Sequence, residues 1–301
     1  MVVLGPNRYG KAETRLVRVL RDGGVHHIKD VNVSSALSGA MEDVHLAGDN
    51  AAVLPTDTQK NTVYALARKH GVDEIEDFAI LLARHYVESQ PSVHHARVEI
   101  EEYLWDRIGE GQDSRPPGER HSFVRSGAEV RTCVVHHDRD GTTTVTSGLK
   151  DLVVLNSTGS EFSGFIRDEY TTLAPTRDRV LSTAVSARWR HLPRDFRSGT
   201  SYGFGASYSE VRRCLLEAFA GTHSLSLQQT LYAMGKRVLE TREEICEVRM
   251  AMPNRHHFPV DLTPFGLDNP NEVFYAADRP YGLIEGAVLA DDAPGAGFAW
   301  E

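Results

Sequence analysis

The sequence predicts an α+β fold made of two tandem copies of one unit. Segments that alternate apolar and polar residues occur in pairs, as half-buried strands do. Two helical segments stand between two such pairs, and this order is seen twice along the chain. The hairpin signal Asp140-Gly141 lies between the copies, so we expect one unit at 1–140 and the other at 141–301.

The first copy opens with two strand-like segments joined by the turn residues Asp22-Gly23-Gly24. Two helical segments follow, and Asp57 is expected to cap the first of them. The alternation of Ala96, Val98 and Ile100 with charged residues then indicates a strand. The expected elements are strands 9–20 and 26–34, helices 58–69 and 74–89, and strands 96–104 and 129–136.

The second copy repeats the order. Its expected elements are strands 142–147, 152–155 and 179–189, helices 208–220 and 225–239, and strands 245–252 and 256–262. Two segments, 109–120 and 191–206, are expected to be surface loops because they are rich in turn-forming residues. Gly203-Phe204-Gly205 in the second loop does not complete a Gly-x-Gly-x-x-Gly pattern, so no phosphate site is expected.

Composition excludes several classes of protein. Hydrophobic residues make up 41% and charged residues 25%, and the formal net charge is −9 with both signs mixed along the chain. This balance argues against a nucleic-acid binder and against an anionic membrane surface as partner. No apolar run is long enough to span a bilayer, and the first residues do not resemble a signal peptide. We therefore expect a cytoplasmic protein, and its net charge is compatible with a small anionic substrate if a few basic groups converge locally.

The sequence predicts no metal site. The three cysteines are far apart and form no Cys-x-x-Cys pair. Adjacent histidines occur at 26–27, 94–95, 136–137 and 256–257. Neighbouring residues of a strand point to opposite faces, so no such pair holds one ion by itself.

Two polar residues stand where helices are expected to begin. Thr56 lies beside the first turn of helix 58–69, near unpaired amides and the positive end of the helix dipole. Gln228 follows Ser226, whose spacing to Gln229 makes a capping box. A glutamine amide donates and accepts together, which suits a lactam edge. The alternatives are a plain capping segment at Thr56 and a solvated side chain at Gln228.

Four other residues are candidates for binding or proton transfer. Phe162 lies among small polar residues and offers a flat face to a planar ring. Arg179 offers paired planar donors to a carboxylate, imide or urea-like edge. His256 shares a strand face with apolar residues, and Lys11 stands near the start of the first strand. Each also has an ordinary interpretation: a loop anchor, a surface arginine, a core histidine and an exposed lysine.

Taken in order, six blocks of this sequence resemble urate oxidase (uricase) of the bacterial type, over residues 4 to 285. The blocks are Tyr9-Gly10-Lys11-Ala12-Glu13, Thr56-Asp57-Thr58-Gln59-Lys60-Asn61-Thr62-Val63-Tyr64, Thr158-Gly159-Ser160-Glu161-Phe162, Leu227-Gln228-Gln229-Thr230-Leu231-Tyr232, Pro253-Asn254-Arg255-His256-His257-Phe258 and residues 271–285. The resemblance implies the tunnelling fold, with two ββααββ repeats, an antiparallel sheet and helices on one face. It also implies a homotetramer around a β-barrel tunnel, with active sites between subunits.

The implied reaction is the degradation of urate by dioxygen and water to 5-hydroxyisourate and hydrogen peroxide, with no metal and no organic cofactor. The resemblance assigns the grip on the pyrimidine edge of urate to Arg179 and Gln228. It assigns stacking on the purine plane to Phe162, and further lining of the site to Leu173 and Leu227.

The same resemblance assigns the chemistry. Lys11, Thr56 and His256 correspond to a proton-transfer network. Thr56 and Asp57 of the adjoining subunit correspond to residues that contact the five-membered ring. Asn254 corresponds to the residue that holds dioxygen or water above it.

Two other functions fit the sequence less well. One is another tunnelling-fold enzyme that converts a purine or a pterin, often with zinc held by histidine and cysteine. The other is a purine-binding protein without catalysis, which the presence of Lys11, Thr56 and His256 together argues against.

Overall fold

The computed structural model describes residues 1–22, 24–108, 121–196, 200 and 202–301. The expected loop at 109–120 lies outside these residues, as do positions 197–199 and 201 of the expected loop at 191–206. The chain divides into two compact units. Unit 1 comprises Met1–Gly148, Arg190–Ala206 and Pro294–Glu301, and unit 2 comprises Leu149–Trp189 and Ser207–Ala293.

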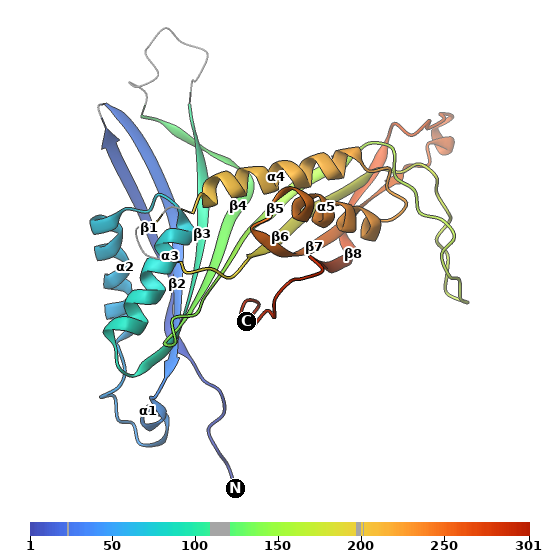
Figure 1. Cartoon of the computed structure of the whole chain (residues 1–301). Helices are drawn as coiled ribbons and strands as arrows, with labels where there is room; N and C mark the ends of the chain where they lie inside the picture. Colours follow the sequence, from blue (N-terminus) through green and yellow to red (C-terminus); the bar gives the residue numbers. More distant parts are fainter. Residues whose placement is uncertain (23, 109–120, 197–199, 201) are drawn as a thin grey trace. The chain divides into compact units, whose positions relative to one another are not determined.

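The protein has an α+β fold with antiparallel strands, as predicted (Figure 1). The helices are α1 (Glu42–Leu46), α2 (Thr56–His70), α3 (Ile75–Ser89), α4 (Phe204–Gly221) and α5 (Leu227–Thr241), with a 3-10 turn η2 (Thr263–Phe265). The strands are β1 (Tyr9–Asp22), β2 (Val25–Gly39), β3 (Val93–Arg107), β4 (Phe123–Asp138), β5 (Thr143–Asn156), β6 (Leu181–His191), β7 (Ile245–Pro259) and β8 (Phe274–Leu289). Their order in the sheet is their order in the chain.

In unit 1, α2 and α3 pack on the sheet (Figure 1). The contact is made by buried apolar side chains. Helix α3 buries Ile75, Phe78 and Leu82, which recur every three or four residues along its inner face. Val98 and Ile100 of β3 alternate with outward residues and pack in the same core. Burying each such side chain contributes roughly 1.5–3 kcal/mol, so the stripe fixes where α3 lies on the sheet.

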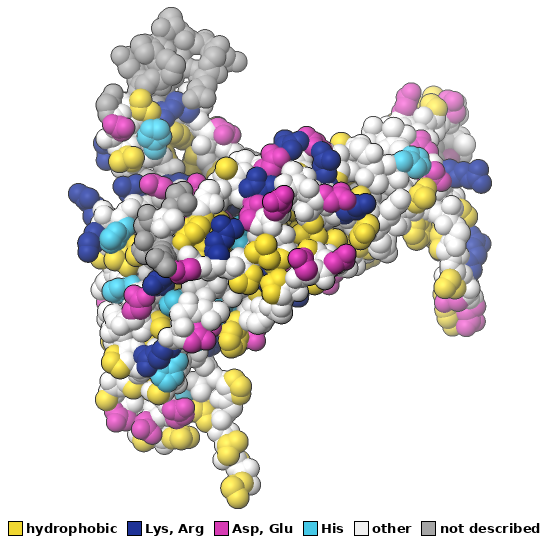
Figure 2. Space-filling model, in the orientation of Figure 1, with side chains coloured by type: hydrophobic (Ala, Val, Ile, Leu, Met, Phe, Trp, Pro, Cys, Tyr) yellow, Lys and Arg dark blue, Asp and Glu magenta, His cyan; other side chains and the backbone are white. Residues whose placement is uncertain are grey.

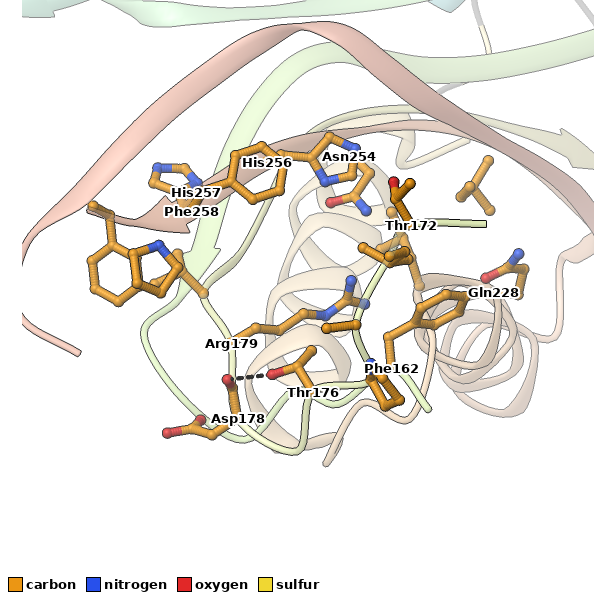
Figure 3. A pocket seen from close by; sticks show the side chains of 18 residues that line it. Phe162, Thr172, Thr176, Asp178, Arg179, Gln228, Asn254, His256, His257 and Phe258 are labelled. Carbon is orange, nitrogen blue, oxygen red and sulfur yellow. Dashed lines mark hydrogen bonds between the residues drawn. The ribbon is translucent and has the colours of Figure 1, made fainter. Parts of the chain in front are cut away.

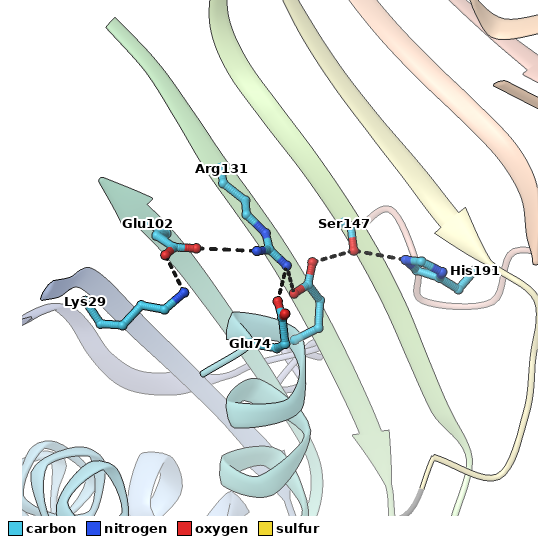
Figure 4. Close-up of polar contacts among 7 residues, drawn as sticks. Lys29, Glu74, Glu102, Arg131, Ser147 and His191 are labelled. Atoms are coloured by element: carbon cyan, nitrogen blue, oxygen red, sulfur yellow. Dashed lines mark hydrogen bonds and ion pairs between the residues drawn. The ribbon is translucent and has the colours of Figure 1, made fainter. Parts of the chain in front are cut away.

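A buried ion network fixes the start of α3 (Figure 4). Arg131 of β4 donates to Glu74 at 2.8 Å and to Glu76 at 2.6 Å. The other oxygen of Glu76 accepts from the Ser147 hydroxyl at 2.7 Å, and His191 lies 2.9 Å from the same hydroxyl. Burial raises the pKa of Glu76, and the charge of Arg131 opposes that rise. The carboxylate of Glu76 is therefore stabilised by its partners rather than by water.

In unit 2, α4 and α5 cover one apolar core, and α5 contacts β7 and β8. Met234 and Val238 of α5 pack in this core with Val248 and Met250 of β7. Gly235 permits close approach, because a Cβ there would lie 2.6 Å from the Val288 side chain of β8. The helix thus lies directly against the strands that carry part of the candidate site.

The helices agree with the sequence prediction better than the strands do. All four predicted helices form, with ends shifted by four residues or fewer at each terminus. The predicted strands 142–147 and 152–155 are one strand, β5, in which Asp151 adopts a positive φ of 59°. The predicted strands 245–252 and 256–262 are likewise mostly one strand, β7, whose pairing with β8 shifts between Asn254 and His256. Strand β8 was not predicted, and it completes the order ββααββ in the second half.

The surface carries charges of both signs. Figure 2 shows Lys or Arg beside Asp or Glu over α4, where Arg213 forms ion pairs with Glu210 and Glu217. Such a mixed surface offers no single-sign field to a nucleic acid on this face. In the part of the chain that the structure describes, no helix is both long and apolar enough to cross a membrane.

Candidate active site

The first group of candidate residues lies in unit 1, where β1 passes the start of α2. Gly10 allows β1 to approach β2 closely, because a Cβ at this position would lie 1.8 Å from the carbonyl oxygen of Ser35. The hydroxyl of Tyr9 accepts from Leu54 N at 2.9 Å and donates to Leu54 O at 3.1 Å. These contacts hold the segment before α2 against the strand that carries Lys11, which is half-buried.

The expected cap at Asp57 is wrong. Helix α2 begins at Thr56, its N-cap is Pro55, and no side chain caps it. Asp57 instead lies in the first turn, where it pairs with Lys60 and accepts from Asn61 at 3.0 Å. The bond and charge of Lys60 lower the pKa of Asp57, and the charge of Lys11 adds to the effect. Lys11, Thr56 and Asp57 therefore gather at one place in unit 1.

A pocket of about 630 Å³ lies in unit 2 (Figure 3). Its walls come from the segment after Phe162, the start of α5, strand β7 and β8. The lining residues are Phe162, Thr172, Leu173, Ala174, Pro175, Thr176, Asp178, Arg179, Val180, Leu227, Gln228, Asn254, His256, His257, Phe258, Pro259, Phe274 and Ile284. This volume suits a small planar molecule.

Arg179 lies two residues before the start of β6, and its side chain extends into this pocket (Figure 3). Its Nε donates to the Ser160 hydroxyl at 3.2 Å, and its guanidinium carbon lies 5.4 Å from the centre of the Phe162 ring. Burial lowers the pKa of Arg179, although the group remains charged. Among the described residues no carboxylate forms an ion pair with Arg179. Its positive charge is therefore available to an anion in the pocket.

Ser226 caps helix α5 as predicted, but the return bond of the capping box goes to the residue before the cap and not to the cap itself. Ser226 accepts from Gln229 N at 3.1 Å, and the side chain of Gln229 accepts from Leu225 N at 2.8 Å. Gln228 is thus held in the first helical turn with an exposed side chain at the pocket, while Leu227 beside it is buried. The cap fixes the place from which the Gln228 amide reaches a ligand.

Strand β7 supplies Asn254 and His256 to the pocket. The His256 ring stacks on Phe258, with 5.5 Å between ring centres. Burial lowers the pKa of His256, and the charges of Arg179 and His257 lower it further. The imidazole is therefore neutral at neutral pH, which leaves it able to accept a proton. His257 was expected on the opposite strand face, yet it also lines the pocket.

The described residues contain no group of three or more His, Cys, Asp and Glu side chains arranged to hold a metal ion. Of the adjacent histidines, His136 contacts His95 at 3.1 Å between ring nitrogens, and His95 in turn contacts Asp138 at 2.8 Å. His137 instead contacts the Thr143 hydroxyl at 2.8 Å. Neighbouring histidines therefore have separate surroundings.

Seven of the residues singled out from the sequence line one pocket, and three do not. The seven are Phe162, Leu173, Arg179, Leu227, Gln228, Asn254 and His256. Lys11, Thr56 and Asp57 lie together in unit 1 and are not among the lining residues. The sequence analysis missed Ser160, which contacts Arg179. The only signal for it was its spacing of two from Phe162, which places both side chains on one side of an extended segment.

Comparison with known proteins identifies the family of this chain. The model of the uricase family matches residues 7–136 and 145–285. The chain is 52% identical to the uricase of Arthrobacter globiformis, over 95% of this chain and 90% of the relative, and 35% identical to that of Danio rerio, over 93% and 92%. A crystal structure of the Arthrobacter globiformis uricase superimposes with a TM-score of 0.89 at 51% identity, over 98% of this chain and 97% of that chain. The chain therefore belongs to the uricase family.

Proposed function

We propose that this protein oxidises urate. In the proposed reaction, urate, dioxygen and water give 5-hydroxyisourate and hydrogen peroxide, and neither a metal nor an organic cofactor takes part. Membership of the uricase family supports the substrate, as do relatives named uricase that match nearly the whole chain. The residues that line the pocket in unit 2 support the proposed mode of urate binding.

One observation carries the proposal: the half-buried guanidinium of Arg179, the ring of Phe162 and the side-chain amide of Gln228 line the same pocket (Figure 3). Urate is a flat anion whose pyrimidine edge presents carbonyl oxygens and N–H groups. The Arg179 guanidinium and the Gln228 amide suit that edge, because together they donate to oxygens and accept from an N–H. The Phe162 ring offers a stacking surface for the purine plane.

The remaining pocket residues suit proton transfer and oxygen binding. A neutral His256 can accept a proton, and the Asn254 amide can hold dioxygen or water above the ring. We assign the rest of the proton-transfer network to Lys11 and Thr56, with Asp57 contacting the five-membered ring. A well-placed acid or base contributes roughly 10²–10⁴-fold to a rate. Leu173 and Leu227 complete the lining.

We further propose a homotetramer, built around a β-barrel tunnel, in which one subunit supplies Thr56 and Asp57 to the pocket of another. The gathering of Lys11, Thr56 and Asp57 in unit 1, apart from the lining of the pocket, supports this arrangement. We also propose that each chain consists of two repeats, 1–140 and 141–301, and that the protein is cytoplasmic. Two features support the repeats: the double ββααββ order, and the break at 137–144 between the matched segments.

The direct test uses purified protein after exhaustive chelation. Mixed with urate in air-saturated buffer, it is expected to remove the urate absorbance and to release about one peroxide per urate, as the balanced reaction requires. Metal analysis of the same sample is the control. Urate that stays unchanged would contradict the proposed reaction. Activity that disappears on chelation and returns with stoichiometric zinc would instead indicate a metal-dependent enzyme of the same fold.

A further inference from the structure

A main-chain bridge joins the two segments that carry the pocket residues Phe162 and Gln228, and three buried hydroxyls lie at this junction. Ser160, Ser224 and Thr230 are each 0% exposed. Ser160 and Ser224 pair as a parallel bridge, in which Glu161 N donates to Ser224 O at 2.7 Å and Ser224 N donates to Gly159 O at 2.9 Å. Thr230 Oγ1 donates to Ser224 Oγ at 2.8 Å. Hydroxyls so deeply buried need their partners, which makes this junction rigid.

Ser160 differs from the other two because it alone of the three contacts Arg179. Its carbonyl oxygen accepts from Arg179 N at 3.0 Å, and its hydroxyl accepts from Arg179 Nε at 3.2 Å. One serine therefore holds both the main chain and the side chain of the arginine. Nε is occupied by this bond, and the two terminal nitrogens of the guanidinium remain for a ligand.

The chemical nature of the partner matters as much as its position. Arginines in proteins are commonly oriented by a carboxylate, which also neutralises their charge. Here the orienting group is a neutral hydroxyl, so the guanidinium is fixed while its whole charge stays available. Such a site suits an anionic ligand that needs both charge and a defined donor direction.

We propose that Ser160 is a positioning residue that orients the Arg179 guanidinium toward the bound purine anion without neutralising it. This inference rests on the proposed function, because urate is the anion. Ser160 itself is fully buried and is not a lining residue of the pocket. Its effect on urate therefore has to pass through the arginine.

The test compares Ser160→Ala with Ser224→Ala, a matched control that removes an equally buried hydroxyl from the same junction without touching Arg179. Binding of urate is measured by calorimetry without oxygen, and KM and kcat are measured in air. Ser160→Ala is expected to weaken binding and raise KM about tenfold, the size of one hydrogen bond to a charged group, with a smaller change in kcat. Ser224→Ala is expected to lower thermal stability to a similar extent and to leave binding within about twofold.

Three further variants separate positioning from general damage. In an Arg179→Ala background, Ser160→Ala is expected to have no added effect on urate binding, because the group it orients is gone. Ser160→Thr, which keeps the hydroxyl, is expected to recover most of the affinity. Ser160→Asp keeps an acceptor but supplies a negative charge, and it is expected to weaken binding at least as much as Ser160→Ala.

Two results would overturn the inference alone: equal urate binding by Ser160→Ala and Ser224→Ala, or the same loss from Ser160→Ala with and without Arg179. Both presuppose wild-type protein that consumes urate. Wild-type protein that neither binds nor consumes urate would overturn the proposed function first, and this inference with it. The wild-type measurement therefore distinguishes the two failures.

Discussion

At the scale of single residues, we expect different pocket residues to serve substrate binding and the chemical step. Arg179 and Gln228 line the pocket, and we expect their charge and hydrogen bonds to hold the ligand already in its ground state. His256, kept neutral by its surroundings, offers a group that matters only when a proton moves. Substitutions at these positions are therefore expected to change different kinetic constants.

Arg179→Ala is expected to raise KM about 10- to 100-fold and to change kcat less, because it removes contacts made before the chemical step. Thr56→Ala and Lys11→Met are expected to lower kcat about 100-fold or more with little change in KM. Steady-state kinetics with urate at fixed oxygen checks both. If Arg179→Ala bound urate with normal affinity in the absence of oxygen, our assignment of Arg179 to substrate binding would be wrong.

The pKa of His256 makes a second prediction. Because the folded protein lowers this pKa below the ordinary value of 6.5, the neutral imidazole persists as the pH falls through 6.5. Activity is expected to be lost only at lower pH, as the pH passes through the lowered pKa. In the unfolded chain the same histidine takes up its proton near 6.5, so it also reduces stability below that pH.

The measurement is kcat/KM against pH for wild type and His256→Gln. Dividing the wild-type profile by that of His256→Gln cancels the titration of urate itself. This ratio is expected to decrease as the pH falls below 6.5. A ratio that does not vary with pH would show that His256 plays no part as a base.

Sequence reasoning found most of these residues through their order rather than through their chemistry. Phe162, Arg179 and His256 each had an ordinary interpretation, and only the six ordered blocks favoured the functional one. Ser160 was missed because its spacing of two from Phe162 was the only local signal, and that spacing does not reveal a contact with an arginine 19 positions away. Both this contact and the bridge between Ser160 and Ser224 form only in the folded chain.

At the scale of elements, amphipathic spacing predicted the helices well. The lengths of β5 and β7 were underestimated, because irregularities within each strand interrupt its alternating pattern. Asp151 with its positive φ interrupts the alternation of β5, and the register shift after Asn254 interrupts that of β7. Strand β8 contains Pro280, Gly282 and Gly286, which a sequence pattern takes as breaks. Pairing with β7 overrides those local signals.

The ion network at the start of α3 gives a prediction about stability. Arg131→Met leaves the buried carboxylate of Glu76 without its cation and is expected to lower the free energy of unfolding by about 3–5 kcal/mol. Adding Glu76→Gln should restore part of the loss, because the unpaired charge is then gone.

Urea unfolding followed by circular dichroism measures these differences. Lys236→Met is the control, because its pair with Glu240 is exposed and contributes little. Equal stability of Arg131→Met and the control would show that the network does not hold α3 in place.

At the scale of the whole molecule, the two clusters of candidate residues predict complementation between subunits. Co-expressed Thr56→Ala and Arg179→Ala chains are expected to regain activity, since random pairing leaves about a quarter of shared sites with both residues intact. At urate concentrations below the wild-type KM, where the raised KM of Arg179→Ala limits its rate, each variant alone should be far less active. Specific activity of the doubly tagged hybrid, purified through both tags, measures the recovery.

The matched control pairs Thr56→Ala with Lys11→Met. Both positions lie in unit 1, so no combination of these two chains restores an intact site. Recovery in this control, or none in the first hybrid, would contradict a site shared between subunits.

The location of Lys11, Thr56 and Asp57 outside the lining of the pocket has a consequence for the cell. If the site is shared between subunits, a newly synthesised single chain cannot form a complete active site, because the pocket and the residues Thr56 and Asp57 at that site come from different chains. Such a chain would generate no oxidant while it is still folding. Peroxide production would then begin with assembly and would decline again wherever dilution separates the subunits.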